Sequence, residues 1–539
     1  MPQKMENAGN FLHIPDEILS FIAAKAFDRV SFTVTRNHLE HLVSVANTVD
    51  NSFNDRLVAS MLIQNAIISA KGIYPLCQDT GTAQVFAWKE GMVLTEGDDT
   101  ESLSRGIEET FTTRNLRFST TIPSSLFEES DPRNNMPAQI MISSNQGAHN
   151  EGAAYRFLFC AKGGGSSNKT SFTQGTKALL NEKAFTEFLH KQISSLGTAA
   201  CPPYTIAVVV GGLSPEQNLL ALKLATAGYF DAELPDWDYR VLGTKPIRDR
   251  EWEKTVCVLA ENTGLGAQFG GRSFAVDARV LRLSRHGASC PVSVGVSCAA
   301  HRNLHGYIDR TGVYLERTIS DPLSIPGLAE GAAFSGTALS VTALSGTAPQ
   351  KPVSIDLDAG LTKVRALLSG MKTGTPILLS GKFLVARDAA HARWHALLAS
   401  GQSLPEYTRK YAILYAGPAE TPSGCVSGSF GPTTAGRMDE YGEELMRSGA
   451  ALVTLAKGNR SEQWRKSCLA YGGTYLGTVG GAAALIADTY ITESSILDYS
   501  DLGMEAVRLV TMKGLPAFVL INDRGEDFYQ SLSEAHTCP

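Results

Sequence analysis

The chain of 539 residues has no long apolar runs and no excess of basic charge. No stretch approaches the roughly eighteen consecutive apolar residues of a membrane span, so we expect no transmembrane helix and no membrane partner. Lys and Arg total 48 against 54 Asp and Glu, a formal net charge of -6, which argues against nucleic acid as a partner. With 43% hydrophobic and 19% charged residues, the composition is that of a globular protein and excludes extended disorder.

Targeting signals and paired cysteines are also missing. The first twenty residues contain one Lys, no Arg and three acidic side chains, which fits neither a secretory signal nor a transit peptide. We therefore expect a cytoplasmic location. The nine cysteines are odd in number and include no C-x-x-C pair. This favours reduced thiols over a disulfide framework or a zinc site of the finger type.

Hydrophobic patterns divide the chain into parts. At roughly 150 residues per domain, about two to four domains are expected. Apolar residues recur at helical spacing over residues 17–72, and strand-like runs alternate with helical patterns beyond residue 351. Residues 321–350 are rich in Gly, Ser, Thr, Pro and Ala and poor in charge, which predicts a domain boundary there. The alternation of strands and helices predicts an α/β layer structure.

Three of the cysteines lie beside Pro or Gly in irregular stretches, where a thiol can leave the core and face a cavity. They are Cys77 in PLCQDTG, Cys201 in AACPPY and Cys290 in HGASCPV. From spacing alone, three dispersed cysteines are more often packed thiols than ligands, because free Cys is commonly buried. We interpret as structural thiols Cys160, Cys257, Cys298, Cys425 and Cys468.

Two glycine-flanked segments carry polar side chains without any periodic reason. The segment KGGGSSNK (162–169) is not a phosphate-binding loop of the Walker type, since Asn168 stands where the second glycine belongs. It is either a flexible turn or a place where the backbone approaches a small anion closely. The segment GPTTAGRMDEY (431–441) resembles a helix start with Thr433 or Thr434 as its cap, and free N–H groups there favour an anion.

Ten short segments, in this order, resemble the class I fumarate hydratases, which depend on an iron–sulfur cluster. They are PLCQDTGTA, AKGGGSSNKT, LGTAACPPY, GAQFGG, RLSRHGASCPV, GVSCAAHRN, VARDAAHAR, YAGPAETPSG, GPTTAGRMD and LAKGNRS. The likeness extends from about residue 20 to about residue 530. It implies an α/β fold with a larger α+β domain over 1–320, a linker over 321–350, a smaller α/β domain over 351–539, and an active site between the domains.

The resemblance changes the interpretation of the three cysteines. In the family, the cysteines that match Cys77, Cys201 and Cys290 bind a 4Fe-4S cluster and leave one iron without a protein ligand. Thiolates suit such clusters, and an open iron acts as a Lewis acid toward the substrate hydroxyl. The family also implies a homodimer and reversible hydration of fumarate to (S)-malate, a small dicarboxylate.

The same resemblance assigns substrate and proton-transfer residues. Positions that contact the substrate carboxylates in the family correspond here to Arg117, Arg387, Arg437 and Lys457, and further substrate contacts correspond to Gln78 and Gly165. The position of Thr433 is proposed to take the proton, with Asp79 as its helper. A threonine hydroxyl is a poor base unless neighbours shift its pKa. Asp79 is alternatively only a turn carboxylate in Asp-Thr-Gly.

The chain departs from the family pattern at two positions. Thr205 and Val276 stand where bacterial members carry histidines. These departures keep two alternatives open: a sibling hydro-lyase that acts on tartrate or mesaconate, and a non-catalytic cluster-binding sensor. Tartrate enzymes of this group resemble the two halves as separate subunits, so a fused chain favours fumarate.

Overall fold

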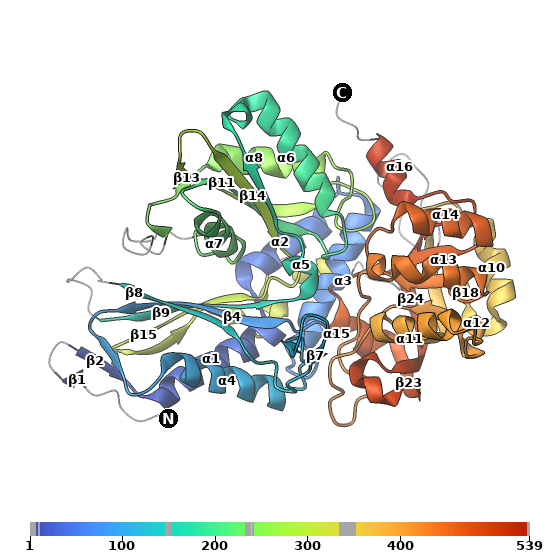
Figure 1. The fold of residues 1–539 in the computed structure, drawn as a ribbon, viewed down its shortest axis with the longest axis horizontal. Helices are drawn as coiled ribbons and strands as arrows, with labels where there is room; N and C mark the ends of the chain where they lie inside the picture. Colours follow the sequence, from blue (N-terminus) through green and yellow to red (C-terminus); the bar gives the residue numbers. More distant parts are fainter. Residues whose placement is uncertain are drawn as a thin grey trace.

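The computed structural model describes residues 7–8, 11–145, 153–231, 239, 242–333 and 352–535. Two parts lie side by side in Figure 1, one formed by the chain before residue 334 and one by the chain after residue 351. The described strands of the two parts belong to separate sheets. Helices and strands are mixed in both parts, which confirms the predicted α/β class. No described helix is both long and apolar enough to cross a membrane.

The first five-stranded sheet of the N-terminal part has the order β16-β15-β9-β4-β8. Its strands are β4 (Thr82–Glu90), β8 (Gln139–Asn145), β9 (Tyr155–Lys162), β15 (Asn303–Asp309) and β16 (Gly312–Leu315). Helices α1 (Asp16–Phe32) and α4 (Asp99–Thr113) pack against each other beneath this sheet (Figure 1). Their apolar faces meet β9 through the rings of Phe27, Phe111 and Phe159, because burial of these large side chains removes much apolar surface from water.

The second five-stranded sheet has the order β10-β14-β11-β13-β12. Its strands are β10 (Ser171–Gly175), β11 (Tyr204–Gly212), β12 (Ile247–Arg248), β13 (Ala275–Arg285) and β14 (Cys290–Ser297). Helix α7 (Pro215–Thr226) lies between the two sheets, and α6 (Glu182–Leu196) and α8 (Arg250–Glu261) lie beyond the second (Figure 1). The predicted step from a strand at 204–212 to a helix at 215–226 is confirmed, with Ser214 capping the helix.

Helices α2 (Arg36–Asn47) and α3 (Phe53–Ser69) complete the helical region predicted at 17–72. The side chain of Ser52 accepts the N–H of Asp55 and so caps α3. The expected linker at 321–350 starts as packed chain, because α9 (Leu328–Ala333) lies against α2 and α3 with Leu328 fully buried. Its remaining residues, 334–350, lie outside the described residues.

The C-terminal part is built on one sheet with the order β18-β19-β20-β21-β22-β24-β23. The strands are β18 (Val353–Asp356), β19 (Pro376–Val385), β20 (Ala412–Leu414), β21 (Val453–Ala456), β22 (Thr474–Gly477), β23 (Ile491–Asp498) and β24 (Val507–Ile521). The first five run parallel, and β24 pairs antiparallel with both β22, at one end of this run, and β19, the second strand from its other end. Its helices are α10 (Leu361–Ser369), α11 (Asp388–Ala399), α13 (Asp439–Arg447), α14 (Glu462–Tyr471) and α16 (Phe528–Ala535).

The two parts share one core. A single cluster of buried apolar side chains extends from α2 and α3 through β11 and β14 into the C-terminal sheet. Helix α3 also contacts the short helix α15 (Ala483–Leu485) at the boundary between the parts (Figure 1). This shared apolar core holds the two parts together, and so fixes the positions of the polar residues that line the boundary between them.

Candidate active site

Three cysteines meet at the boundary between the parts, each from a different loop. Cys77 follows α3, Cys201 precedes β11, and Cys298 follows β14. Strands β11 and β14 are antiparallel, with Thr205 opposite Ser297, so the start of one strand lies beside the end of the other. The N–H of Ala299 donates to the carbonyl of Cys201 at 3.0 Å and fastens these two loops together.

The three thiols lie close enough to affect one another's charge. Burial and the nearby Asp79 and Cys201 together raise the pKa of Cys77 to about 11, against the opposing charges of Arg302 and Lys457. Burial likewise raises the pKa of Cys201, and the neighbouring Cys298 adds to this rise. Without a positive partner, thiolates would be unfavourable in this buried place.

The structure contradicts the prediction that Cys290 joins Cys77 and Cys201. Cys290 is the first residue of β14 and Cys298 follows its last residue. An eight-residue strand is about 26 Å long, so Cys290 lies at the far edge of the sheet, opposite Gly175 of β10. Its thiol is near the charge of Arg285 and not near the other two cysteines. Cys298, interpreted from the sequence as a structural thiol, instead occupies the place beside Cys201 that was predicted for Cys290.

Lys457 supplies the positive partner. It follows β21, and its Nζ donates to the sulfur of Cys201 at 2.8 Å. Burial by itself would lower the pKa of Lys457, but the thiols of Cys201 and Cys77 outweigh burial and raise it. The lysine therefore carries its charge in the site and favours the thiolate form of the cysteines.

Thr433 lies on the loop next to Lys457. Its N–H and its hydroxyl both donate to the carbonyl of Tyr415, at 2.7 and 3.2 Å, and its own carbonyl accepts the N–H of Lys457. The expected helix start is a short 3-10 turn, Ala435–Met438, whose cap position is Thr434 without a side-chain capping bond. Thr433 is therefore not a helix cap. Its hydroxyl is buried in the boundary, and its donated bond leaves its lone pairs available.

Gln78 connects the first cysteine loop to the Thr433 loop. Its Nε2 donates to the carbonyl of Pro432 at 3.3 Å. A Cβ on Gly431 would lie 2.4 Å from its Oε1, so only glycine leaves room for the amide. The first loop of the N-terminal part thus contacts the residue immediately before Thr433.

Asp79 is bound to the glycine-rich segment rather than left as a free turn carboxylate. Its Oδ2 accepts the N–H of Gly164 at 2.8 Å, and its Oδ1 accepts the hydroxyl of Ser119 at 3.3 Å. Burial raises its pKa, but Arg117, Arg302, the Gly164 N–H and Lys457 together lower it below the usual value. The backbone of residues 162–169 approaches an anionic group closely, but that group is the Asp79 carboxylate and not a small bound anion, since a Cβ on Gly163 would lie 2.8 Å from Oδ2. Gly165 lies next to Ala200, one residue before Cys201.

Three arginines from both parts gather beside these loops. Burial and the charges of Arg117 and Arg437 together lower the pKa of Arg387 to about 10, against the opposing charges of Glu505 and Asp388. Arg387 pairs with Glu505, and Arg437 pairs with Asp388 at 3.1 Å. The Nε atoms of Arg117 and Arg387 are buried without a hydrogen-bond partner in the described part of the chain. This arrangement concentrates positive charge with unused donors, which is what a dicarboxylate needs.

Sequence reasoning missed further charged or titratable groups at the boundary. The buried Arg302 is close enough to Cys77 and Asp79 to affect both, and burial lowers the pKa of Lys162 to about 8. His38 bonds the carbonyl of Ala299 through Nε2 at 2.7 Å. Cys298 and Arg302 both lie in the segment GVSCAAHRN, one of the ten segments that resemble the family, so the sequence did contain a pattern that indicates them.

Thr205 and Val276, the two positions at which the chain departs from the family pattern, lie near the cysteine loops. Thr205 is buried on β11, where it pairs with Ser297 on one side and Asp277 on the other. Val276 is partly buried on β13 and packs against the shared core. No described group of three or more His, Cys, Asp or Glu side chains converges closely enough to hold a single metal ion.

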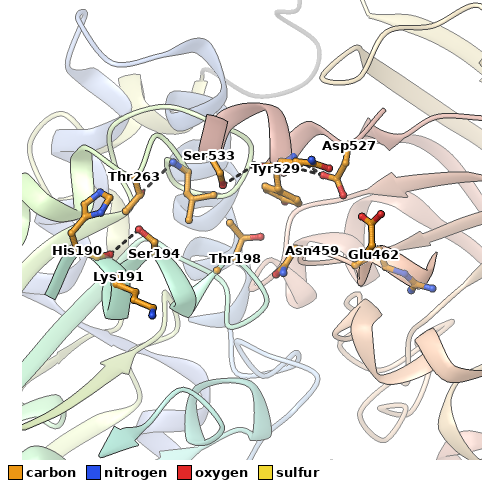
Figure 2. A pocket seen from close by; sticks show the side chains of 14 residues that line it. His190, Lys191, Ser194, Thr198, Thr263, Asn459, Glu462, Asp527, Tyr529 and Ser533 are labelled. Atoms are coloured by element: carbon orange, nitrogen blue, oxygen red, sulfur yellow. Dashed lines mark hydrogen bonds between the residues drawn. The ribbon is translucent and has the colours of Figure 1, made fainter. Parts of the chain in front are cut away.

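A separate groove of about 560 Å³ opens between the two parts on the outer side of these loops. Figure 2 shows His190, Lys191 and Ser194 of α6 on one wall and Asn459, Glu462 and Asp527 on the other. Thr198 and Asn459 line it, three residues before Cys201 and two after Lys457. The groove contains none of the predicted site residues.

Comparisons with known proteins cover almost the whole chain. A family model described as fumarate hydratase (fumerase) matches residues 21–306, and one described as fumarase C-terminus matches residues 337–532. Over 519 residues the chain is 43% identical to fumarate hydratase 2 of Leishmania major, a match that spans 96% of this chain and 87% of the relative. Over 522 residues it is 42% identical to the aerobic class I fumarate hydratase of Escherichia coli K12, across 97% and 91% of the two chains. A putative L(+)-tartrate dehydratase subunit beta of Methanocaldococcus jannaschii is 30% identical over 168 residues, 30% of this chain and 86% of that one.

Proposed function

Because the chain belongs to the class I fumarate hydratase family, whose members are hydro-lyase enzymes, we propose that it interconverts fumarate and (S)-malate. The observation that carries this proposal is the meeting of three thiols with a cluster of cations at the boundary between the parts. The family implies an iron–sulfur cofactor, and we propose a 4Fe-4S cluster held by Cys77, Cys201 and Cys298. The corrected ligand set differs from the sequence prediction only in the third cysteine.

The residues present fit such a cluster. Its cysteine ligands bind different iron atoms, so they stand further apart than ligands to one ion, which agrees with the absence of a single-ion site among the described residues. The Lys457 ammonium beside Cys201 offsets part of the negative charge that thiolates and cluster would bring. When bound, the cluster would supply an iron without a protein ligand, a Lewis acid that makes hydroxide a better leaving group.

The cations and Gln78 bind and orient the substrate in this proposal. Arg117 comes from the N-terminal part, and Arg387, Arg437 and Lys457 come from the C-terminal part, so a dicarboxylate between them contacts both. The buried Nε donors of Arg117 and Arg387 are free for carboxylate oxygens. Negative charge that develops on the carboxylate as a neighbouring carbon loses its proton is stabilised by groups already in place. Gly165 lies beside the second cysteine loop, where a Cβ would contact Ala200, and its backbone is proposed to contact the substrate there.

Thr433 is the proposed proton acceptor and Asp79 its helper. To accept a proton, the Thr433 hydroxyl must itself be deprotonated, and the Lys457 ammonium on the adjacent loop favours this by stabilising the alkoxide. Asp79 has a lowered pKa, so it is charged at neutral pH and balances the surrounding arginines. Its bonds to Gly164 and Ser119 hold the carboxylate in one orientation.

A tartrate hydro-lyase is the second candidate, and the similarity to the putative tartrate dehydratase subunit supports it. The full-length relatives named fumarate hydratase outweigh this shorter match and also disfavour a non-catalytic sensor. Mesaconate is kept as an alternative substrate for the same site. The homodimer, the cytoplasmic location and the domain limits at 1–320 and 351–539 stay predictions, the last supported by the separate sheets.

The test is anaerobic purification, cluster reconstitution and measurement of fumarate consumption by its absorbance. We expect a brown protein with fast turnover, and loss of both colour and turnover in Cys298→Ser. The matched control Cys290→Ser changes a cysteine at the other end of the same strand and should keep both. A brown protein that is inert toward fumarate but active on tartrate would contradict the substrate assignment. A colourless protein after reconstitution would contradict the cluster.

A further inference from the structure

A glycine-rich segment of the C-terminal part, Thr478–Leu485, lies between two of the cysteine loops. A Cβ on Gly480 would lie 2.5 Å from the sulfur of Cys201, closer than real side chains approach. A Cβ on Gly481 would lie 3.2 Å from Leu62 of α3 and 3.7 Å from the Cβ of Cys201. The backbone of this segment therefore forms the wall against which the second thiol packs.

Gln268 fastens the Cys201 loop to one end of this segment. Its Nε2 donates to the carbonyl of Pro202 at 3.0 Å and to the carbonyl of Gly480 at 2.9 Å. Its Oε1 accepts the N–H of Gly480 at 2.7 Å. Both amide hydrogens are thus used, and the side chain is almost fully buried. The carbonyl of Gln268 also accepts the hydroxyl of Tyr529, which Figure 2 places at the groove between the parts.

Asn65 fastens the Cys77 loop to the other end of the segment. It lies on α3, and its Nδ2 donates to the carbonyl of Leu76, the residue before Cys77, at 2.9 Å. Its Oδ1 accepts the N–H groups of Ala484 and Leu485 at 2.8 and 3.0 Å. Like Gln268, it is buried and uses both amide hydrogen-bonding functions.

The two amides resemble each other in what they join. Each comes from the N-terminal part, bonds the backbone beside one cysteine, and bonds the backbone of the same C-terminal segment. Hydrogen bonds are directional and short, and a buried amide group that loses its hydrogen-bond partners lowers the stability of the folded protein. The two cysteine loops are therefore held at a set separation by a segment that only the C-terminal part provides.

We propose that Gln268 and Asn65 are positioning residues that set the spacing of the Cys201 and Cys77 thiols through Thr478–Leu485, so that a docked C-terminal part completes the cluster site. The proposal rests on the proposed function, because it takes these cysteines as cluster ligands. It differs from the assignment of ligands, since neither amide touches a sulfur, the substrate or a reacting atom.

The test uses four variants of the full-length chain. Gln268→Met and Asn65→Leu remove the amides at similar volume. Asn218→Leu is the matched control, because Asn218 is also a buried amide bonded to two carbonyls, those of Val209 and Gly211 at the far end of β11. Gln268→Glu is a second variant of nearly the same shape, which keeps an acceptor for the Gly480 N–H and loses the donated bonds.

Thiol reactivity in the cluster-free protein is the first readout. Alkylation followed peptide by peptide should rise about tenfold at Cys201 in Gln268→Met, and at Cys77 in Asn65→Leu, because local opening exposes each thiol. The second readout is retained iron and the visible spectrum after anaerobic reconstitution and gel filtration. Both amide variants should retain less iron than wild type, and Asn218→Leu should retain as much.

Thermal unfolding of all variants separates positioning from simple stability. If Gln268→Met and Asn65→Leu lower the melting temperature as Asn218→Leu does, with unchanged thiol reactivity and iron retention, the proposal is overturned. If Gln268→Met does not fold, Gln268→Glu decides by the same two readouts. A wild type that holds the cluster but does not hydrate fumarate would contradict the proposed function alone, and the thiol readout tests the positioning role even in a protein that takes up no iron.

Discussion

The two parts of the molecule bring different chemistry to the site. The N-terminal part contributes the thiols and Asp79, on loops at the ends of antiparallel strands. The C-terminal part contributes Arg387 and Lys457, which follow the parallel strands β19 and β21, and Thr433 between them. Carboxyl ends of parallel strands share one edge of a sheet, whereas an antiparallel strand presents opposite ends at opposite edges. The N-terminal part would thus hold the cofactor, while the C-terminal part provides the proposed proton acceptor and three of the four cations proposed to bind the substrate.

The largest effect should come from the N-terminal part. Cys298→Ser removes one of three cluster ligands, so we expect loss of the brown colour and a fall in turnover of about a thousandfold or more, since the open iron supplies the main chemistry. Visible spectra, iron content and fumarate turnover measure this. Normal iron content in the variant would mean that the third ligand lies elsewhere.

Loss of the proposed proton acceptor should lower turnover but leave the brown colour of the cluster unchanged. Thr433→Val removes the hydroxyl in the C-terminal part, and we expect wild-type iron content with kcat lowered by about 10²–10⁴-fold, the usual range for a missing proton-transfer group. Thr434→Val is the control, because Thr434 is the neighbouring residue and its hydroxyl donates to the carbonyl of Ala199. Equal losses in the two variants would show that the loop, and not the Thr433 hydroxyl, matters.

Substrate binding should be weakened by Arg437→Gln, again with the colour unchanged. A charge-assisted hydrogen bond contributes about 1.5–3 kcal/mol, so KM for fumarate should rise roughly 10–100-fold. Steady-state kinetics on the reconstituted enzyme measure it, with exposed Arg447→Gln of α13 as the control. An unchanged KM would place the carboxylates against the other cations only.

The smallest effect is expected for Cys290→Ser, although this cysteine lies in the N-terminal part like the cluster ligands. Its thiol is buried at the far end of β14, so colour and kcat should stay within about twofold of wild type, and the melting temperature should fall slightly because a hydroxyl replaces a packed thiol. Spectra and thermal unfolding test this. A colourless Cys290→Ser protein would reverse the ligand assignment.

Much of the fold was predictable from local pattern. The helical spacing over residues 17–72 predicted α1 to α3, and the apolar runs after residue 351 predicted β18, β19, β20, β21 and the end of β24. Strands β22 and β23 were not predicted, and β24 starts well before its apolar end. Half-exposed strands such as β23 lack a continuous apolar run, so their pairing depends on the neighbouring strand.

The candidate site was predictable in composition but not in geometry. Ordered motifs identified the family and named Cys77, Cys201 and the cations, since these residue types follow from the chemistry. They indicated Cys290 as the third cysteine, although Cys298 lies only eight residues further along the chain with similar neighbours. Only the antiparallel pairing of β11 and β14 places Cys298 beside Cys201, because strand direction converts sequence distance into distance in space.

The sequence by itself determined the class of the fold, the family and the kinds of side chain available for the reaction. The tertiary structure alone decided which side chains meet, because the site lies between two parts whose loops are far apart in the chain. The contact of Lys457 with Cys201 and the bonds of Gln268 to Gly480 join residues more than two hundred positions apart. Such contacts follow from the docking of two packed sheets around a shared core, which no local pattern of residues encodes.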